Sequence, residues 1–414
     1  METGVSNQNN NIPEGFKMTE LGPLPEEWKV AELGDVAHVT AGGAAPQGDR
    51  HFRGKNPFIR VQHISEESAR ISGWDLITDE AVRKYGLRLF PKGTIVFPKS
   101  GASIRLEKRA VLPVDAYIVS HLCALLSNAR LVDNAFLFQT LRDVRFAEAK
   151  AEGYPTLRLS EIKAKLIPLP PLPEQKAIAR VLSTIQRAVE AQDKVIAAAR
   201  ELKKSLMRYL FTYGPVPVAE AEKVPLKETE IGLIPEHWEV ARLGDIATLQ
   251  RGRDLPKQNQ VPGQYPVVGS SGIIGYHNTY VCEGPGIVTG RSGSIGKLIY
   301  VEERYWPHNT GLYVRDFHEN NPKFVYYLLH LLDFEKYATG VSVPTLNRNF
   351  VHSASLPVPP VAEQQETARI LAAVDTKIET EEKRKAALQT LFKTMLHLLM
   401  TGRVRVKDLE AQVA

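Results

Sequence analysis

Two glycine- and serine-rich turns carry the side chains best suited to chemistry in this chain of 414 residues. Residues 98–105 read Pro-Lys-Ser-Gly-Ala-Ser-Ile-Arg, and residues 290–297 read Gly-Arg-Ser-Gly-Ser-Ile-Gly-Lys. Each turn follows an apolar run that is typical of a β-strand. Small residues let the backbone approach a ligand closely, and lysine or arginine can contact phosphate groups. The two turns therefore predict sites of ligand binding.

Catalytic signatures are missing from these turns. The second turn imitates a phosphate-binding loop, but Arg291 occupies its first glycine position and Leu298 replaces the serine or threonine that would hold Mg²⁺. No group of histidine, cysteine and carboxylate residues has metal-ligand spacing in the sequence, and no Ser/His/Asp set can be singled out. Cys123 and Cys282 lie far apart without a CxxC motif, so we expect both to be buried small residues.

The composition is that of an ordinary globular protein, with 43% hydrophobic and 24% charged residues. The net charge of +5 is compatible with a polyanionic partner but favours one only slightly. No apolar run approaches the roughly 18 residues of a membrane span, and the polar, Asn-rich start does not read as a signal peptide. We expect a cytoplasmic protein with two or more domains.

The elements that must position these two turns belong to a sequence pattern that occurs twice in the chain, which we call the frame. The opening Pro-Glu-x-Trp-x-Val-Ala-x-Leu-Gly-Asp at residue 25 recurs at residue 235, a shift of 210. Further along the shift is 189, since Pro-Thr-Leu at 155 recurs at 344 and Glu-Gln at 174 recurs at 363. Between these anchors almost nothing matches, so residues 44–154 and 254–343 are unlike inserts in two copies of one frame. Two copies of one frame that hold unlike inserts suit a protein that recognises two different targets at a fixed separation.

Each copy of the frame ends in a long helix, expected at residues 173–213 and 361–401. Pro173 suits a first helical turn, and no glycine or proline follows until Gly214. Apolar residues recur at spacings of three and four, which predicts that the two helices pair as an antiparallel coiled coil within the chain. A helix of about 38 residues at about 1.5 Å each would span about 57 Å and could set the distance between two readers. The residues expected in the pairing seam are Ile178, Leu182, Ile185, Val189, Leu371, Val374, Ile378 and Leu388.

Two interpretations of this helical pair stay open. The pair could be an inert dimerisation stalk rather than a spacer. Gln192 and Glu381 occupy equivalent seam positions, where buried polar residues can fix the register at some cost in stability, or else both simply lie near water.

The inserts combine strand and helix patterns. In the first insert we expect strands at 57–61, 94–97 and 116–119 and a helix at 134–150. In the second we expect strands at 266–268, 286–289 and 297–301 and a helix at 322–337. The fold class is therefore mixed α/β, or α+β.

The duplicated frame, its Pro-Leu-Pro-Pro-Leu-Pro-Glu-Gln and Pro-Val-Pro-Pro-Val-Ala-Glu-Gln helix entries and its long helices resemble the specificity (S) subunit of Type I restriction-modification systems. The likeness covers residues 19–402, with Ala362 as a departure at the position equivalent to Pro173. It implies two similar target recognition domains joined by the antiparallel helices, a pseudo-twofold tandem duplication. The expected parts are a disordered tail at 1–18, recognition domain 1 at 19–170, spacer helix 1 at 171–214, a linker at 215–228, recognition domain 2 at 229–358, spacer helix 2 at 359–402 and a C-terminal tail at 403–414.

The resemblance implies a noncatalytic subunit that recognises a bipartite, asymmetric site in double-stranded DNA. It also implies partners, two methyltransferase (M) subunits and restriction (R) subunits, which would bring S-adenosylmethionine, ATP and Mg²⁺ chemistry; this chain is expected to bind no cofactor or metal. The alternatives are a self-contained DNA-modifying enzyme and a coiled-coil scaffold that touches no nucleic acid. Missing catalytic motifs count against the first, and unlike inserts count against the second.

Reading DNA bases requires side chains such as arginine or lysine for guanine and asparagine or glutamine for adenine, with phosphate contacts in support. In the first insert the candidates are Arg60, Gln62, His63, Lys99, Ser100, Ser103, Arg105, Lys108 and Arg109. Around the second insert they are Arg251, Arg253, Ser271, His277, Arg291, Ser292, Ser294, Lys297, His308, Asn309, Asn347 and Arg348. Trp28 and Trp238 occupy matching frame positions, which favours core packing over stacking on bases.

Overall fold

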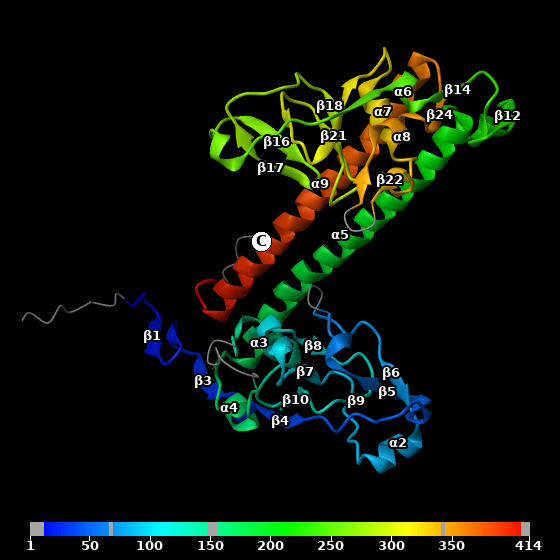
Figure 1. The fold of residues 1–414 in the computed structure, drawn as a ribbon. Helices are drawn as coiled ribbons and strands as arrows, with labels where there is room; N and C mark the ends of the chain where they lie inside the picture. The colour runs from blue at the N-terminus through cyan, green and yellow to red at the C-terminus, as the bar shows by residue number, and fades with distance from the viewer. Residues whose placement is uncertain (1–11, 66–68, 147–155, 341–343, 407–414) are drawn as a thin grey trace, which may run out of the picture. The chain divides into compact units, whose positions relative to one another are not determined.

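The computed structural model describes residues 12–65, 69–146, 156–340 and 344–406 and divides them into two compact units (Figure 1). Unit 1 comprises the residues up to Ala191 together with those from Lys385 onward, and unit 2 comprises Gln192–Arg384. Each long helix therefore contributes one half to each unit. From the sequence we expect the long helices to be separate from the two recognition domains. The division in the structure differs from this expectation because the apolar faces of the helices complete the core of each unit.

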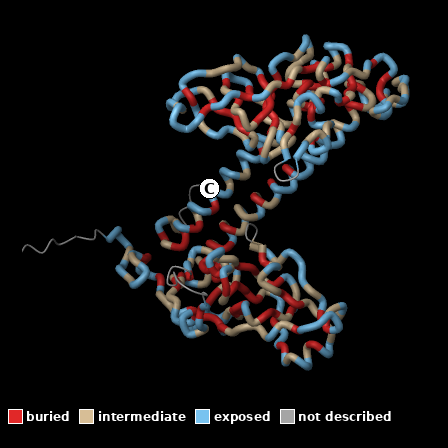
Figure 2. Tube along the Cα trace, viewed as in Figure 1, coloured by how far each residue is buried: buried red, intermediate tan, exposed pale blue. Residues whose placement is uncertain are grey.

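The two long helices form where the apolar periodicity predicts them. Helix α5 spans Leu172–Tyr213 and helix α9 spans Val361–Met400. Within unit 1, Leu182 near the start of α5 shares a core with Leu396 near the end of α9. Within unit 2, Leu210 near the end of α5 shares a core with Leu371 near the start of α9. The helices thus run antiparallel, as predicted, and buried positions recur along both (Figure 2).

The predicted seam residues differ in burial. The buried ones lie near the start of α5, near its middle or near the start of α9: Ile178, Leu182, Val189 and Leu371. The others are half-buried: Ile185, Val374, Ile378 and Leu388. Gln192 and Glu381 are both buried and hydrogen-bonded to each other within unit 2. The interpretation that they merely lie near water is therefore wrong, whereas their role in fixing the register stays a prediction.

The glutamate of each Glu-Gln pair joins the helix start to the opening of the frame. The indole N–H of Trp28 donates to Glu174 at 3.0 Å, and that of Trp238 donates to Glu363 at 2.8 Å. Both tryptophans are fully buried, so the prediction that they pack in the core is confirmed. A buried indole N–H needs an acceptor, which explains why tryptophan and glutamate recur together.

The glutamine of each pair holds the turn before a short helix of the recognition domain. The Gln175 side chain accepts from the backbone N–H of Asp133 at 2.8 Å and donates to the carbonyl of Pro170 at 2.8 Å. The Gln364 side chain accepts from the backbone N–H of Asn321 at 2.9 Å and donates to the carbonyl of Pro359 at 3.0 Å. Both glutamines are buried, so each must satisfy its own polar groups as well as those of the turn.

Unit 1 is built around a four-stranded sheet with the order β4-β10-β7-β8. A three-stranded sheet, β6-β5-β9, lies in the insert, and β3 pairs antiparallel with β11 to close the domain where the chain enters and leaves it. The strands are β1 (Phe16–Thr19), β2 (Gly22–Pro25), β3 (Lys29–Glu32), β4 (Ala37–Ala41), β5 (Phe52–Ile59), β6 (Asp75–Ile77), β7 (Ile95–Pro98), β8 (Ala110–Val111), β9 (Tyr117–Ile118), β10 (Leu122–Ser127) and β11 (Leu166–Leu169). The short helices are α1 (Leu33–Val36), α2 (Asp79–Lys84), α3 (Asn134–Asp143) and α4 (Leu159–Lys163).

Unit 2 repeats this plan with a four-stranded sheet of order β15-β21-β18-β19, a three-stranded sheet β17-β16-β20 and a closing pair β14-β24. Its strands are β12 (Leu226–Thr229), β13 (Gly232–Pro235), β14 (Glu239–Arg242), β15 (Thr248–Arg251), β16 (Tyr265–Gly269), β17 (Gly272–His277), β18 (Gly286–Gly290), β19 (Leu298–Val301), β20 (Trp306–Pro307), β21 (Gly311–Asp316), β22 (Ala338–Thr339), β23 (Thr345–Leu346) and β24 (Ser355–Val358). Its short helices are α6 (Leu243–Ile246), α7 (Pro322–Leu329) and α8 (Arg348–His352).

Several expected boundaries need correction. The expected tail and linker are partly ordered into strands, since β1 begins at Phe16 and β12 at Leu226, each pairing in a hairpin with the next strand. Helix α3 ends at Asp143, because the chain turns there to stack Phe146 on Phe97; residues 147–150 lie outside the described residues. Helix α7 ends at Leu329, and the chain turns to bury Phe334.

The two cysteines differ in their burial. Cys123 is buried as expected, and burial raises the pKa of its thiol to about 12, whereas Cys282 is only half-buried. Neither is disulfide-bonded.

In the described part of the chain, no helix has the length and apolar character that crossing a membrane would require.

Candidate nucleic-acid interface

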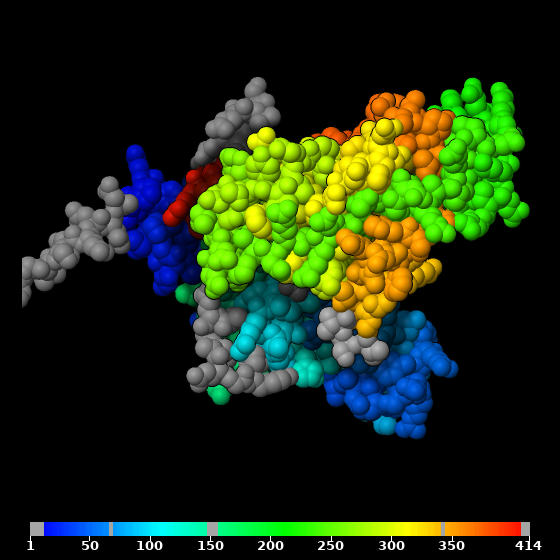
Figure 3. Space-filling model, turned by 45° about the horizontal axis from the view of Figure 1, so that its top comes forward, coloured from blue at the N-terminus to red at the C-terminus, as the bar shows by residue number. Residues whose placement is uncertain are grey.

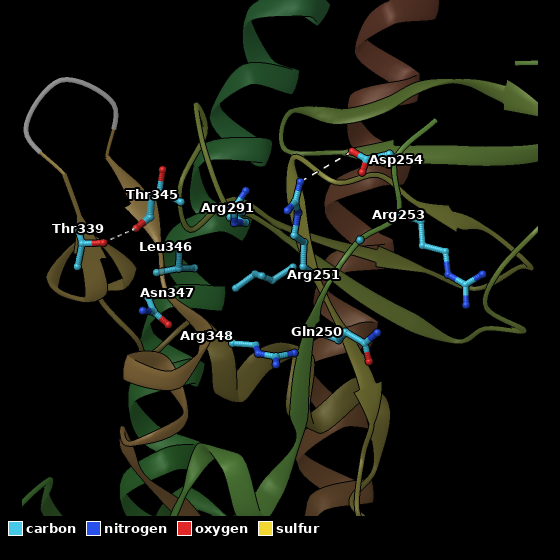
Figure 4. Close-up of a pocket in the computed structure, with 12 residues that line it drawn as sticks. Gln250, Arg251, Arg253, Asp254, Arg291, Thr339, Thr345, Leu346, Asn347 and Arg348 are labelled. Carbon is cyan, nitrogen blue, oxygen red and sulfur yellow. Dashed lines mark hydrogen bonds and ion pairs between the residues drawn. The ribbon is translucent and has the colours of Figure 1, made fainter. Parts of the chain in front are cut away.

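Unit 2 contains a hollow of about 770 Å³ lined by four arginine side chains (Figure 4). The lining comes from the end of β15, the turn after β18, and the segment that runs from β22 through β23 to α8. In Figure 3, orange residues of the region around β22 to α8 lie against green residues on the surface of unit 2. The lining residues are Gln250, Arg251, Gly252, Arg253, Asp254, Arg291, Leu312, Thr339, Thr345, Leu346, Asn347 and Arg348.

Backbone hydrogen bonds fix the positions from which these side chains leave. The N–H of Arg253 donates to Pro307 at 2.8 Å, and the N–H of Arg291 donates to Thr310 at 2.9 Å. The carbonyl of Arg291 accepts from Leu346 at 2.8 Å, so the residue is held on both sides. A side chain at position 252 would place its Cβ 2.1 Å from the His308 carbonyl oxygen, which leaves glycine as the residue that fits there.

The hollow carries an excess of positive charge. Asp254 is the one carboxylate in its lining; Arg251 approaches it at 3.8 Å, and the side-chain amide of Asn309 donates to it. Among the residues that the structure describes, no acidic side chain forms an ion pair with Arg253, Arg291 or Arg348. Guanidinium groups donate hydrogen bonds and cannot accept them, so this hollow suits an acceptor-rich, anionic ligand.

Unit 1 has the same backbone arrangement at the equivalent place. The N–H of Gly42 donates to Leu122 at 3.1 Å, as that of Gly252 donates to Gly311 at 3.0 Å. The carbonyl of Lys99 accepts from Leu157 at 2.8 Å, in the same way as the carbonyl of Arg291 accepts from Leu346.

The side chains mounted on this shared backbone are different. The two sequence registers and these hydrogen bonds match Arg251, Arg253, Arg291 and Arg348 of unit 2 with Ala41, Gly43, Lys99 and Leu159 of unit 1. One lysine therefore stands where unit 2 has four arginines, and Arg158 of unit 1 stands where unit 2 has Asn347. Ser100 of unit 1 contacts His121 at 2.6 Å, and His121 occupies the position of Thr310.

The predicted residues of unit 2 fall into three groups. Five line the hollow: Arg251, Arg253, Arg291, Asn347 and Arg348. Six lie outside this lining: Ser271, Ser292, Ser294, Lys297, His308 and Asn309. Among these, the Lys297 ammonium donates to the Ser271 carbonyl at 2.6 Å, and burial lowers the pKa of His308, which contacts Thr310 at 3.1 Å.

The third group is His277, whose proposed contact with DNA must be corrected. Its ring is buried, packs edge-on against Trp306 with 5.2 Å between ring centroids, and hydrogen-bonds the Val261 backbone. These contacts occupy the imidazole within unit 2, so its task is structural.

In unit 1, several predicted residues remain accessible. Gln62 and Arg105 are exposed, and Lys99, Ser100, Ser103 and Lys108 are half-buried. Arg60 forms an ion pair with Asp75 at 2.7 Å, and the neighbouring His63 accepts from the Arg60 backbone N–H at 3.0 Å. Burial lowers the pKa of His63. A hollow of about 590 Å³ in the described part of unit 1, lined by Arg70, Phe138 and Arg142 among others, includes none of these candidates.

Arg109 is the second correction. Its guanidinium group is buried, lies 4.9 Å from the Phe97 ring centroid and 5.1 Å from that of Phe146, and donates to the Leu141 carbonyl at 3.2 Å. It also pairs with Glu107. With these contacts inside the core of unit 1, Arg109 stabilises the fold and is not available to DNA.

Four polar or charged residues of the hollow were missed from the sequence: Gln250, Asp254, Thr339 and Thr345. Thr345 matches Thr156 in the second register, and this match could have flagged it. Gln250 directly precedes Arg251 on β15, and its side-chain oxygen accepts from Arg315 at 3.4 Å. Thr339 gave no local signal, because it reaches the hollow only through the pairing of β22 with β23.

Comparison with known proteins identifies the family. The family model described as Type I restriction modification DNA specificity domain matches residues 25–198 and 235–390, that is, both copies of the frame. The chain is 28% identical to the putative type I restriction enzyme MjaX specificity subunit of Methanocaldococcus jannaschii, with 95% of this chain and 97% of the relative covered. It is 26% identical to the MjaVIII specificity subunit of the same organism, with 96% and 97% covered.

Solved structures share the fold. The S subunit of a Type I restriction-modification system from M. genitalium matches with a TM-score of 0.61 and 18% identity, covering 95% of this chain and 97% of that one. A chain from a study of complex assembly and conformational transition of the type I R-M system matches with a TM-score of 0.53 and 16% identity, covering 92% and 99%. The chain belongs to the Type I restriction-modification specificity family, and it is a noncatalytic DNA-recognition subunit.

Proposed function

From this family membership, we propose that the chain recognises a bipartite, asymmetric DNA site, with one half read by each unit. It would then direct the methyltransferase and endonuclease subunits of a Type I complex to that site. The observation that carries the proposal is the shared backbone site at Gly42 and Gly252, which displays different side chains in the two units.

The chemistry of the two sites supports different reading. Arginine can donate two hydrogen bonds to guanine, and asparagine or glutamine can recognise adenine, so the residues mounted on a frame decide which base pairs it accepts. Unit 2 presents Gln250, Arg251, Arg291 and Asn347, whereas unit 1 presents Thr40, Ala41, Lys99 and Arg158 at the matching positions. Unlike side chains on a repeated frame would give unlike half-sites.

The partners we propose are two methyltransferase subunits and, through them, restriction subunits. S-adenosylmethionine, ATP and Mg²⁺ would be bound by those partners. The long helices offer exposed apolar residues to such subunits, including Val195 and Leu202 on α5 and Leu391 on α9. Apolar side chains that the fold leaves exposed on a helix are suited to burial against a partner.

An exchange of inserts tests the proposal. Replacing residues 44–154 by the insert of another family member should change one half of the methylated sequence and leave the other half unchanged. The matched control replaces residues 254–343 and should change the opposite half. Mapping of methylation across a genome by the reconstituted complex gives both results directly. A simultaneous change of both halves by either exchange would refute the assignment of one half-site to each unit.

A further inference from the structure

We propose that unit 2 reads a guanine through Arg291 and Arg348, so that its half-site contains a G·C pair whose recognition depends on the guanidinium fork. This inference rests on the proposed function and names the base that the hollow selects. Figure 4 shows the two side chains leaving from separate segments beside the hollow, while Arg251 reaches toward Asp254.

The polar inventory of the hollow favours acceptors on the ligand. Its four guanidinium groups can only donate hydrogen bonds. The side-chain oxygen of Asn347 already accepts from the backbone N–H of Asn349 at 3.0 Å, and that of Gln250 accepts from Arg315. Asp254 accepts from Asn309 and lies near Arg251. Each amide and carboxylate group of the lining thus already accepts a hydrogen bond within unit 2, while Arg253, Arg291 and Arg348 have no ion-pair partner among the described residues.

Guanine is the base whose major-groove edge matches this inventory. Guanine presents two acceptors, O6 and N7, whereas thymine presents one acceptor, O4, beside a methyl group, cytosine presents a donor, and adenine presents one donor beside one acceptor. A bidentate guanidinium group can use both of its donors only on guanine. The guanidinium groups could donate to both acceptors of guanine, whereas an amino group of adenine or cytosine facing the same guanidinium groups would find no acceptor on them. Phosphate oxygens are acceptors too, so the charge of arginine alone cannot distinguish guanine from a DNA phosphate. The bidentate geometry of the guanidinium group must make this distinction.

Arg291 and Arg348 are better placed for a base than the other two arginines. Arg251 is drawn toward Asp254, and Arg253 points away from the centre of the hollow in Figure 4. The Arg291 backbone is hydrogen-bonded through both its N–H and its carbonyl, which fixes the point from which its side chain reaches out. The equivalent residues of unit 1, Lys99 and Leu159, have no guanidinium fork. The geometry therefore assigns this mode of guanine reading to unit 2.

Substitution of arginine by lysine separates base reading from phosphate contact, because lysine keeps the charge and loses the bidentate fork. The full chain, alone and with methyltransferase subunits, is bound to a randomised duplex library as wild type, Arg291→Lys and Arg348→Lys. One position of the half-site read by unit 2 should lose its preference for guanine by about 5- to 150-fold in at least one variant. The matched control, Arg304→Lys, alters an exposed arginine that pairs with Glu283 and does not line the hollow. It should leave the motif unchanged.

Glutamine variants at positions 291 and 348 complete the test. If these arginines bound only phosphate groups, their replacement by glutamine would weaken binding to all sequences alike and reduce the slope of log K against log salt by about 0.9 for each phosphate. That result, with unchanged motifs in both lysine variants, would overturn guanine reading while leaving the bipartite function intact. A wild-type half-site without a G·C pair would overturn it as well. A wild-type chain that selects no bipartite sequence would instead refute the proposed function.

Discussion

Unit 1 and unit 2 share a frame and differ in what the frame holds. In both, a buried tryptophan donates to the glutamate of a helix start, and a buried glutamine holds the next turn. The order of the four-stranded sheet is also the same. The side chains at the shared backbone site differ, however: unit 2 has Arg251, Arg253, Arg291, Asn347 and Arg348 where unit 1 has Ala41, Gly43, Lys99, Arg158 and Leu159. The contrast teaches that the frame requires its buried contacts, whereas the surface it displays can vary.

The contacts that anchor each recognition domain to the helices differ in the same way. In unit 2 the Tyr327 hydroxyl donates to Asp375 at 2.7 Å, and Asp375 pairs with Lys203 of α5 at 2.6 Å. The matching residues of unit 1 are Phe138, Gln186 and Phe392. There Arg142 supplies the polar contact instead: its guanidinium lies 4.3 Å from the Phe392 ring centroid and donates to Gln186 at 3.2 Å. Burial lowers the pKa of Arg142 to about 10.

The largest expected effect tests the shared frame. Leu182 and Leu371 are matching residues with no exposed area, so Leu182→Asp and Leu371→Asp should each destabilise their own unit by about 3–5 kcal/mol, the cost of an uncompensated buried charge. Calorimetric unfolding of the full chain, with limited proteolysis to identify the opened unit, measures the loss. Leu202→Asp, at a residue 52% exposed, is the control and should change little. Tolerance of aspartate in one unit alone would show that the frames are not equivalent.

A smaller effect tests the unlike anchors. Tyr327→Phe copies the side chain of Phe138 and removes the hydrogen bond to Asp375, which should destabilise unit 2 by roughly 1–3 kcal/mol. Tyr326→Phe is the matched control, because the structure gives its hydroxyl no hydrogen bond among the described residues. Denaturant unfolding of both variants gives the difference. Equal stability of the two variants would mean that the Asp375 contact does not anchor the domain.

The smallest effect is a difference in acid sensitivity. Partial burial lowers the pKa of His308 and His352 in unit 2, and desolvation by packing against Tyr326 does the same for His330, although this residue keeps an exposed surface; His63 is the histidine so affected in unit 1. A histidine whose folded-state pKa lies below 6.5 stabilises the fold above that pH, and this stability is lost as the pH falls toward the folded-state pKa, because the unfolded chain binds more protons. Between about pH 7 and pH 5.5, unit 2 should therefore lose more stability than unit 1.

Calorimetry of the full chain across this pH range follows both units. His330→Leu, which copies the matching Leu141 of unit 1, should reduce the acid sensitivity of unit 2. If the variant and the wild type lost stability in parallel, His330 would not contribute to the difference.

Much of the fold could be predicted because its signals are local or repeated. The proline and glycine residues near the helix ends, together with the apolar spacing between them, placed α5 and α9 within two residues of their observed ends. The repeat separated the frame from the inserts and indicated that Trp28 and Trp238 share a structural task. The sequence did not explain why Glu174 and Gln175 recur as Glu363 and Gln364, since their partners lie far away along the chain.

The arginines show what could not be predicted from the local sequence. Arg109 and Arg348 were equal candidates from the sequence, yet one is buried against Phe97 and Phe146 and the other lines an open hollow. Residue type and spacing determined that basic side chains would follow the strands, because both depend on near neighbours. Tertiary structure decided which of them line the hollow, because the burial and pairing of a long charged side chain depend on aromatic rings and carbonyl groups contributed by distant segments.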